Sequence, residues 1–328
     1  MKKILQRLFQ QEYLSQKEAK EILIQIAREE FNPAHIAAFL TVFQMRPIAT
    51  NELIGFRNAL LELCLSIDLT DYDSVDLCGT GGDGKDTFNI STLAAVVVAG
   101  AGYTVTKHGN YGVSSVCGSS NVLEKLGYTF TNDEKKLRHQ LDQHQLCFLH
   151  APLFHPAMKA VGGIRKALGI RTFFNLLGPL VNPIQPNKQM VGVSNLETVR
   201  LYQYVLQQTN KEFAIVHALD GYDEVSLTGE FKIITPRSEE RLAPKTVGQQ
   251  QHDAIALHGG ATVDAAAKIF LNILEGKGSQ AQNEVVCTNA GIAIQRFNPK
   301  KELIDCIEEA KDALLSKKAY HNFKQLIQ

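Results

Sequence analysis

Apolar side chains recur at helical spacing along the first 66 residues, and no strand-like alternation interrupts them. Ser15 followed by Glu18 has the form of a capping box, and Asn32 before Pro33 is typical of a helix start. Thr50 is predicted to cap a further helix. The chain therefore begins with a segment that consists of helices only.

From Asp73 onwards, short apolar runs alternate with helical stretches. The predicted strands cover residues 74–78, 103–107, 146–150 and 213–217, and the predicted helices cover residues 92–101, 121–126, 197–207, 263–274 and 303–315, the last two closing the chain. Strand–helix alternation predicts an α/β fold with a largely parallel central sheet covered by helices. Residues 236–257 are polar and contain Pro, Gly and Gln, so we predict a mobile connection there.

The stretch Gly79-Thr80-Gly81-Gly82-Asp83 follows the first predicted strand. Backbone N–H groups can approach a ligand closely there, because glycine has no side chain. A helix start follows, and its unpaired N–H groups favour an anion, so loop and helix together are typical of a phosphate site. The residues that can add side-chain donors are Thr87, Asn89, Ser91 and Thr92, of which Ser91 can also ligate Mg²⁺. The alternative is a tight turn with ordinary helix caps, since the loop has neither the Walker nor the dinucleotide-binding pattern.

A second polar stretch, Lys107-His108-Gly109-Asn110, comes directly after the next predicted strand, and Ser114-Ser115 and Ser119 lie beyond it. Because the carboxyl ends of parallel strands converge on one crevice, Lys107 is predicted to face the same cavity as the glycine loop. Its ammonium group can neutralise a phosphate, and the serine-rich loop can hold another. The alternatives are a solvated strand end for Lys107 and a hydrogen-bonded structural histidine for His108.

Two adjacent carboxylates, Asp223 and Glu224, follow the strand predicted at residues 213–217. They suit Mg²⁺, which prefers oxygen ligands and is often shared with the phosphates of a substrate. The alternative is an acidic surface turn. Arg165, ten residues after His155, can bind a carboxylate with its planar guanidinium, or it can be an ordinary surface arginine of a helix.

Composition narrows the choice of partners. Lys and Arg total 34 and Asp and Glu total 34, so the formal net charge is zero. This argues against nucleic acid or an anionic membrane as a partner, because both are bound by an excess of cations. The chain shows no signal-peptide pattern, and its six cysteines are scattered without a C-x-x-C pair, so we predict free thiols and a cytoplasmic location.

Taken together, these motifs closely resemble one family, anthranilate phosphoribosyltransferase, over nearly the whole chain. The stretches that carry the resemblance are Gly79-Thr80-Gly81-Gly82-Asp83, Asn89-Ile90-Ser91-Thr92, Lys107-His108-Gly109-Asn110, His155-Pro156-Ala157-Met158-Lys159, Arg171-Thr172, Phe174-Asn175-Leu176-Leu177-Gly178-Pro179-Leu180, Asn182-Pro183 and Asp220-Gly221-Tyr222-Asp223-Glu224. The resemblance implies transfer of the 5-phosphoribosyl group from phosphoribosyl pyrophosphate to the amine of anthranilate, in tryptophan biosynthesis.

The resemblance also implies an architecture. A small helical domain would cover residues 1–70, joined by helices near residues 163–185, and an α/β domain would cover residues 71–328. The substrates would lie in the cleft between these domains, and the helical domains would form a homodimer. An N-terminal fusion to a glutamine amidotransferase is not expected, because the helical domain starts at residue 1.

Site residues are implied by the same resemblance. Phosphoribosyl pyrophosphate would be bound by Gly79, Gly82, Asp83, Thr87, Asn89, Ser91, Thr92, Lys107 and Ser119. Two Mg²⁺ ions would be held by Ser91, Asp223 and Glu224. Anthranilate would meet Gly79, Asn110, Arg165, His108, Ala151, Pro152 and His155. No general base is assigned, because positioning and electrostatics would carry most of the rate.

Two positions depart from the family pattern. Tyr111 stands where arginine is common, which removes a cation from the substrate loop, and Gly162-Gly163 stands where Ala-Pro is common, which weakens the helix before Arg165. Three other functions stay open at this point: a pyrimidine nucleoside phosphorylase, a non-catalytic relative that binds nucleic acid, and transfer to a different aromatic acceptor. The Lys107–Asn110 motif and the acidic pair favour the phosphoribosyltransferase.

Overall fold

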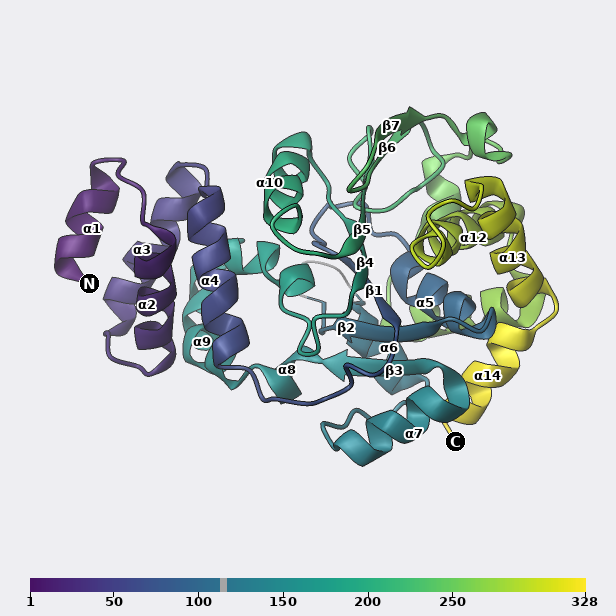
Figure 1. Cartoon of the computed structure of the whole chain (residues 1–328), viewed down its shortest axis with the longest axis horizontal. Helices are drawn as coiled ribbons and strands as arrows, with labels where there is room; N and C mark the ends of the chain where they lie inside the picture. Colours follow the sequence, from purple (N-terminus) through teal and green to yellow (C-terminus); the bar gives the residue numbers. More distant parts are fainter. Residues whose placement is uncertain (113–116) are drawn as a thin grey trace. The chain divides into compact units, whose positions relative to one another are not determined.

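The structure, a computed structural model, describes residues 1–112 and 117–328, so Ser114-Ser115 of the predicted phosphate loop lie outside the described residues. The chain divides into two compact units, residues 1–67 with 151–185 and residues 68–150 with 186–328. The predicted fold class is confirmed, because the first unit is helical and the second contains a seven-stranded, mostly parallel sheet (Figure 1). Within the described residues, no helix is long and apolar enough to cross a membrane.

The helical unit begins with four helices and is completed by a later segment. Its elements are α1 (Lys2–Phe9), α2 (Gln16–Ala27), α3 (Pro33–Met45), α4 (Thr50–Glu62), α8 (Ala151–Phe154), α9 (Lys159–Leu168) and three short 3₁₀ turns, η1 (Pro156–Met158), η2 (Phe173–Leu176) and η3 (Gly178–Leu180). The predicted caps of Ser15 and Asn32 are confirmed, since each side chain accepts a backbone N–H of its helix.

The prediction that Thr50 caps α4 is wrong by one residue. Ala49 is the N-cap, and its N–H donates to the carboxylate of Glu52 at 2.9 Å. Glu52 is fully buried, accepts the N–H of Leu14, and forms an ion pair with buried Arg46. Glu52, three residues after Ala49, therefore satisfies the N–H at the start of α4, and the contacts with Leu14 and Arg46 hold its buried carboxylate in place.

Phenylalanines form the centre of the helical unit. The ring of Phe56 in α4 stacks on Phe173 at 4.3 Å, and Phe173 stacks on Phe174 at 4.7 Å. Phe39 and Phe43 of α3 meet Phe173 edge to face. Such offset and edge contacts add to the stabilisation from burying the rings. This cluster joins α3 and α4 to the segment that follows α9.

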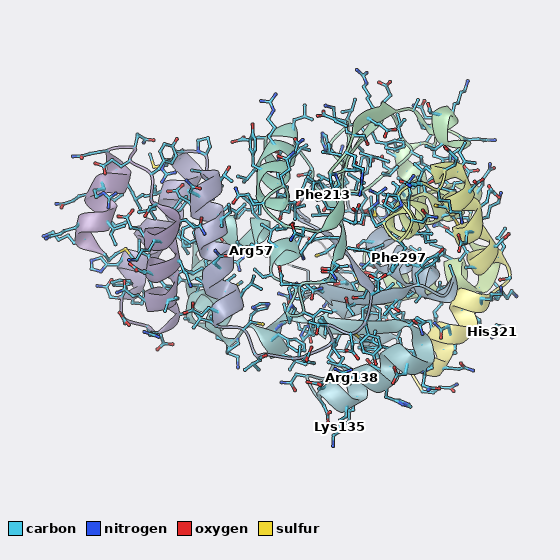
Figure 2. All side chains as sticks on the ribbon, viewed as in Figure 1. Arg57, Lys135, Arg138, Phe213, Phe297 and His321 are labelled. Atoms are coloured by element: carbon cyan, nitrogen blue, oxygen red, sulfur yellow. The ribbon has the colours of Figure 1, made fainter. Side chains whose placement is uncertain are left out.

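Arg57 of α4, labelled in Figure 2, makes a second connection within the helical unit. Its Nε donates to the carbonyl of Leu180, and a terminal N–H donates to the side chain of Gln185. The chain segment that ends the unit is thereby held to α4 by a polar anchor as well as by the aromatic cluster.

The second unit has the strand order β3-β2-β1-β4-β5-β6-β7. Its strands are β1 (Ser74–Gly79), β2 (Thr104–Gly109), β3 (Leu146–His150), β4 (Lys188–Gly192), β5 (Glu212–Ala218), β6 (Phe231–Ile234) and β7 (Glu239–Leu242). The first five pair in parallel, whereas β6 and β7 are antiparallel additions at one edge. Strands β1 and β2 are buried along most of their length, as expected for parallel strands with covered faces.

Helices cover the sheet. They are α5 (Ile90–Gly100), α6 (Ser119–Lys125), α7 (Glu134–His144), α10 (Leu196–Leu206), α11 (Val263–Asn272) with a π turn (Ile273–Lys277), α12 (Gln280–Gln295), α13 (Leu303–Leu315) and α14 (Lys318–Leu326). In Figure 1, α10 lies on one side of β4 and β5, and α12 and α13 lie on the other. Helix α5 is buried on nearly all its faces, which explains its run of small apolar residues.

Three expectations for the second unit need correction. Residues 236–257 are not a plain mobile connection, because they contain β7 and the 3₁₀ turns η4 (Pro244–Val247) and η5 (Ala254–Leu257). The exposed edge position of β7 explains its polar sequence. Strands β4 and β6 went unpredicted, and the chain closes with α12 and α14 in addition to the two predicted helices. All six cysteines are free thiols, as predicted.

Two helical glycines of the first unit lead to opposite predictions. A Cβ on Gly55 of α4 would lie 2.4 Å from the carbonyl oxygen of Gln16 and 2.6 Å from the Cβ of Ala19 in α2, whereas a Cβ on Gly163 of α9 would meet nothing within 4 Å. Gly55→Ala is expected to lower the free energy of unfolding by about 1–3 kcal/mol through overpacking. Gly163→Ala is expected to raise it by up to about 1 kcal/mol through helix propensity. Thermal unfolding of both variants checks this, and a shift of the same sign in both would contradict it.

Candidate functional site

The order of the strands marks one place in the second unit as a crevice. Going outward from the middle of the sheet, β1 leads to β2 and β3 in one direction, and β4 leads to β5 in the other. Gly79 ends β1, Gly192 ends β4, and the two are partners in the register. Ligands of open α/β sheets bind beside the carboxyl ends of the strands where the order reverses. The glycine loop predicted from sequence begins at this point.

Asp223 lies directly over these two glycines. A Cβ on Gly79 would be 2.4 Å from Asp223 Oδ2, and a Cβ on Gly192 would be 1.6 Å from the backbone oxygen of Asp223. Any side chain at either strand end would therefore displace the acidic segment. Asp223 Oδ2 also accepts the N–H of Gly81 at 2.6 Å, which ties the carboxylate to the glycine loop.

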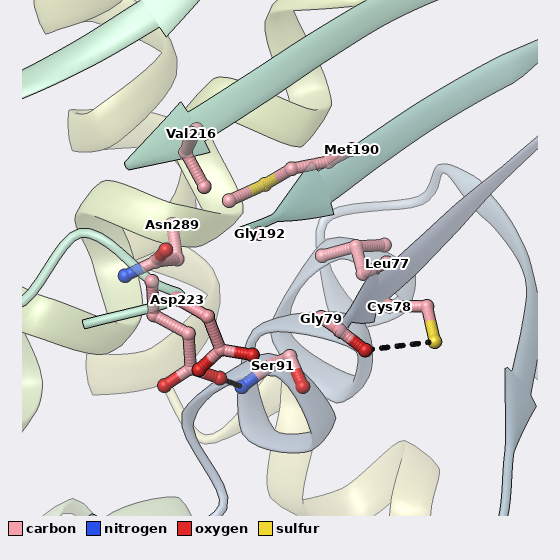
Figure 3. A pocket seen from close by; sticks show the side chains of 10 residues that line it. Leu77, Cys78, Gly79, Ser91, Met190, Gly192, Val216, Asp223 and Asn289 are labelled. Atoms are coloured by element: carbon pink, nitrogen blue, oxygen red, sulfur yellow. Dashed lines mark hydrogen bonds between the residues drawn. The ribbon is translucent and has the colours of Figure 1, made fainter. Parts of the chain in front are cut away.

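Glu224 makes the matching contact with the helix that follows the loop. Its Oε1 accepts the N–H of Ser91 at 2.9 Å, in the first turn of α5. A carboxylate is stabilised there by the unpaired N–H groups and the positive end of the helix dipole. The loop and the helix start thus hold the two carboxylates as well as being available to a phosphate. Figure 3 shows Asp223 and Ser91 next to one another near the carboxyl end of β1.

Keeping Asp223 and Glu224 ionised in a buried position costs free energy as long as no positive charge compensates them. Asp223 is 8% exposed, and burial followed by repulsion from Asp83 raises its pKa. Burial, followed by the charge of Asp223, raises the pKa of Glu224 well above its usual value. In the described part of the chain, neither carboxylate has a Lys, Arg or His within ion-pair distance. Bound positive charge would restore the ionised forms of both groups.

This donor set fits a hard cation that is shared with a ligand. Two carboxylates and the nearby Ser91 side chain supply oxygen atoms, which Mg²⁺ prefers. Across residues 1–112 and 117–328, no group of three or more His, Cys, Asp or Glu side chains comes together to hold a metal. Two carboxylates and one hydroxyl can furnish part of a Mg²⁺ coordination sphere, because Mg²⁺ usually keeps several waters and is often shared with phosphates.

Lys107 and His108 are both buried at the end of β2. The ammonium group of Lys107 donates to the carbonyl of Leu77 in β1, and the N–H of His108 donates to Asp76 Oδ1 at 3.0 Å. The structure thus places the Lys107 side chain in a buried position against β1 and not at a solvated strand end. Asn110 follows in an exposed position, and its backbone oxygen accepts the hydroxyl of Ser119.

The remaining residues predicted for phosphoribosyl pyrophosphate line the same stretch of chain. Gly82 has φ +73°, a conformation that favours glycine. The side chain of Asp83 accepts the backbone N–H of Lys85. Thr87 forms an isolated antiparallel β-bridge with His258 through the backbone. The side-chain amide of Asn89 donates to the carbonyl of Cys117. Thr92 is buried inside α5, which leaves Ser91 as the more accessible hydroxyl of the helix start.

Tyr111 replaces the expected cation with an aromatic contact. Its ring meets the ring of His150 edge to face at 4.8 Å, and its hydroxyl lies 3.4 Å from Glu124. His150 in turn stacks on Phe130 and bonds to the hydroxyl of Ser120. The tyrosine therefore attaches the chain after Asn110 to the end of β3 through a ring contact.

The predicted acceptor residues of the helical unit have different environments. Ala151 and Pro152 form the first turn of α8, and Pro152 is exposed. His155 is buried, burial lowers its pKa, and its Nε2 donates to the carbonyl of Val181 at 2.8 Å. A histidine fixed in this way is suited to shaping the segment more than to binding a ligand directly. Arg165 in α9 is half-buried and lies over the ring of Phe174, 5.3 Å from its centroid.

Sequence reasoning missed the residues that support the acidic pair from behind. A pocket of the second unit is lined by Leu77, Cys78, Gly79, Ser91, Met190, Gly192, Val216, Asp223, Glu224 and Asn289 (Figure 3). Asn289 of α12 accepts the N–H of Val225 at 3.1 Å and donates to its carbonyl at 2.9 Å, which fixes the backbone next to Glu224. No local motif marks Asn289 or Gly192, because each acts through a distant segment. Burial raises the pKa of the Cys78 thiol to about 12, so this cysteine is neutral near pH 7.

Comparison with known proteins gives full-length matches. Residues 2–64 match a family described as "Glycosyl transferase family, helical bundle domain", and residues 71–320 match "Glycosyl transferase family, a/b domain". The anthranilate phosphoribosyltransferase of Flavobacterium johnsoniae is 55% identical over 99% of this chain and 98% of its own length. That of Bacteroides thetaiotaomicron is 49% identical over 100% of this chain and 99% of its own length.

Solved structures agree. The anthranilate phosphoribosyltransferase of Thermus thermophilus has a TM-score of 0.91 at 30% identity and covers 98% of both chains. The enzyme of Saccharomyces cerevisiae in complex with PRPP and Mg has a TM-score of 0.87 at 26% identity, covering 96% of this chain and 93% of its own. High identity over the whole length, the two matched domains and the conserved architecture together lead to one conclusion: the chain belongs to the anthranilate phosphoribosyltransferase family.

Proposed function

We propose that this chain transfers the 5-phosphoribosyl group of phosphoribosyl pyrophosphate to the amine of anthranilate, giving N-(5-phosphoribosyl)anthranilate and pyrophosphate in tryptophan biosynthesis. The observation that carries the proposal is the pair Asp223 and Glu224, held over the strand ends by the N–H groups of Gly81 and Ser91. Such a pair suits a substrate whose phosphates share bound Mg²⁺ with the two carboxylates. The names of full-length relatives at 49% and 55% identity point to the same reaction.

Asp223, Glu224 and the hydroxyl of Ser91 are the residues that would hold Mg²⁺, in the predicted number of two ions. When bound, Mg²⁺ would neutralise the charge that develops on the pyrophosphate leaving group. The raised pKa values of both carboxylates support this assignment, because they reflect burial and the repulsion of a neighbouring carboxylate, both of which a bound cation would offset. The complex of the yeast relative with PRPP and Mg supports the use of Mg²⁺.

The glycine loop and its neighbours would bind the rest of phosphoribosyl pyrophosphate. The residues proposed for this task are Gly79, Gly82, Asp83, Thr87, Asn89, Ser91, Thr92, Lys107 and Ser119. Backbone N–H groups and the buried ammonium of Lys107 are fixed before the substrate arrives, so they need little reorganisation as charge moves to the leaving group.

For the acceptor, we propose that Arg165 binds the carboxylate of anthranilate and that Asn110 orients the ring. His108, Ala151, Pro152 and His155 would border its path, with Gly79 close to the reacting amine. The amine attacks the ribose and can shed its proton afterwards, so no general base is needed. A complex of the yeast relative with 4-fluoroanthranilate is consistent with an aromatic acceptor of this kind.

A homodimer formed through the helical unit and a cytoplasmic location are further parts of the proposal. Large apolar side chains on that unit support the dimer: Phe9 is 62% exposed, Tyr13 54% and Met45 79%. Large apolar side chains left exposed in this way are available to a protein–protein interface.

The reaction itself can be tested by following anthranilate fluorescence. The chain contains no tryptophan, so the protein adds no indole background. We expect fluorescence to fall only when both phosphoribosyl pyrophosphate and Mg²⁺ are present. Phosphorolysis of a pyrimidine nucleoside, with no consumption of anthranilate, would contradict the proposal and support the nucleoside phosphorylase.

Replacing both metal carboxylates tests the metal assignment. Asp223→Asn with Glu224→Gln keeps acceptors for the N–H groups of Gly81 and Ser91 but removes the charge, so we expect Mg²⁺-dependent turnover to fall by about 100-fold or more. Thermal unfolding with phosphoribosyl pyrophosphate should also lose its dependence on added Mg²⁺. The control is Asp220→Asn, in the same turn, which should retain both properties. An unchanged Mg²⁺ dependence in the double variant would reject the assignment.

The role of Arg165 predicts a difference between the two substrates. Arg165→Ala removes the partner of the acceptor carboxylate only, so KM for anthranilate should rise by about 10- to 100-fold while KM for phosphoribosyl pyrophosphate stays near its original value. Steady-state kinetics with each substrate varied in turn provides the measurement. Lys166→Ala, an exposed neighbour on the same helix, is the control. Equal rises for both substrates would refute the role.

A further inference from the structure

We infer that Asn175 is a positioning residue that holds the Arg165 guanidinium ready for the carboxylate of the acceptor, and that it must be a neutral amide to do so. The inference rests on the proposed function of Arg165. Asn175 lies in η2, the short turn that follows α9, and both elements belong to the helical unit.

The side-chain oxygen of Asn175 serves two donors at once. It accepts Arg165 Nη2 at 3.2 Å and the N–H of Thr172 at 3.2 Å. Both partners are donors. Of the two polar atoms of the Asn175 amide, the oxygen can accept a hydrogen bond and the nitrogen can only donate one. The bond to Thr172 therefore fixes which way the amide faces, and it keeps the oxygen directed at the guanidinium.

The aromatic cluster supports the guanidinium from another side. Arg165 lies over the face of Phe174, which stacks on Phe173, and Phe173 stacks on Phe56 of α4. A planar cation above an aromatic ring gains electrostatic attraction without giving up its N–H donors. The position of Arg165 is thus set by one hydrogen bond and one ring, both anchored in the core of the unit.

This arrangement leaves most of the guanidinium free to bind an anion. No carboxylate of the described residues forms an ion pair with Arg165, and its Nε is buried without a hydrogen-bond partner. A buried donor without a partner is costly, so a ligand that supplies an acceptor gains affinity. A carboxylate can take two guanidinium N–H groups side by side. The positive charge stays uncompensated because the residue that holds it is an amide.

Asn175→Asp separates positioning from a purely structural role. Aspartate keeps an acceptor for Thr172 and for Arg165, so thermal stability should stay close to that of the unchanged protein. Its charge, however, would neutralise Arg165 and repel the carboxylate of anthranilate. We expect KM for anthranilate to rise about tenfold, with KM for phosphoribosyl pyrophosphate unchanged. If Asn175 only caps the turn, aspartate would preserve KM for anthranilate, and the inference would be overturned.

A double-mutant cycle provides the second test. Asn175→Ala should raise KM for anthranilate in the presence of Arg165, and it should have no further effect in Arg165→Ala. Additive effects would overturn the inference, even if the aspartate variant failed to fold. If Arg165→Ala by itself leaves KM for anthranilate unchanged, the proposed function of Arg165 fails. If Arg165→Ala raises KM and Asn175→Ala does not, only the positioning role fails.

Discussion

The site depends on two carboxylates brought to a place where carboxylates are costly. Asp223 and Glu224 lie against the carboxyl ends of β1 and β4, and each accepts one backbone N–H, from Gly81 and from Ser91. These bonds, the absence of side chains at the two strand-end glycines, and the grip of Asn289 on the adjacent backbone all serve to keep the pair in position. The charge that remains uncompensated is what suits the site to a cation shared with a substrate.

Where the larger unit holds two carboxyl groups, the helical unit holds a positive charge. There, a cation is held by neutral groups: Arg165 lies over Phe174 and bonds to the amide of Asn175. In the larger unit, two carboxyl groups are held by neutral N–H groups, and burial raises the pKa of both, so that bound positive charge would restore their ionised forms. In both units the side chains are held by neutral groups, so that a charged ligand can supply the opposite charge. The zero net charge of the chain is compatible with a highly charged substrate because a few groups are placed, not because many are present.

Sequence and structure agree most closely where a motif is local. The glycine loop, the start of α5 and the acidic pair were predicted as one phosphate-and-metal site, and the structure brings Gly79, Ser91, Asp223 and Glu224 to one pocket. Disagreement arises where the environment overrides the local pattern. Glu52 caps α4 from a buried ion pair, β7 is polar because it is an exposed edge, and α12 is covered on most sides and so lacks a clear apolar stripe.

The sequence by itself determined the fold class, the family resemblance and the candidate site residues, because helix periodicity, glycine loops and paired carboxylates are properties of neighbours along the chain. Only the tertiary structure decided which of these residues meet. Gly192 matters because β4 pairs with β1, Asn289 because α12 reaches the segment after Glu224, and Asn175 because its turn folds back on α9. Contacts between residues far apart in sequence are set by packing, which no single stretch of sequence encodes.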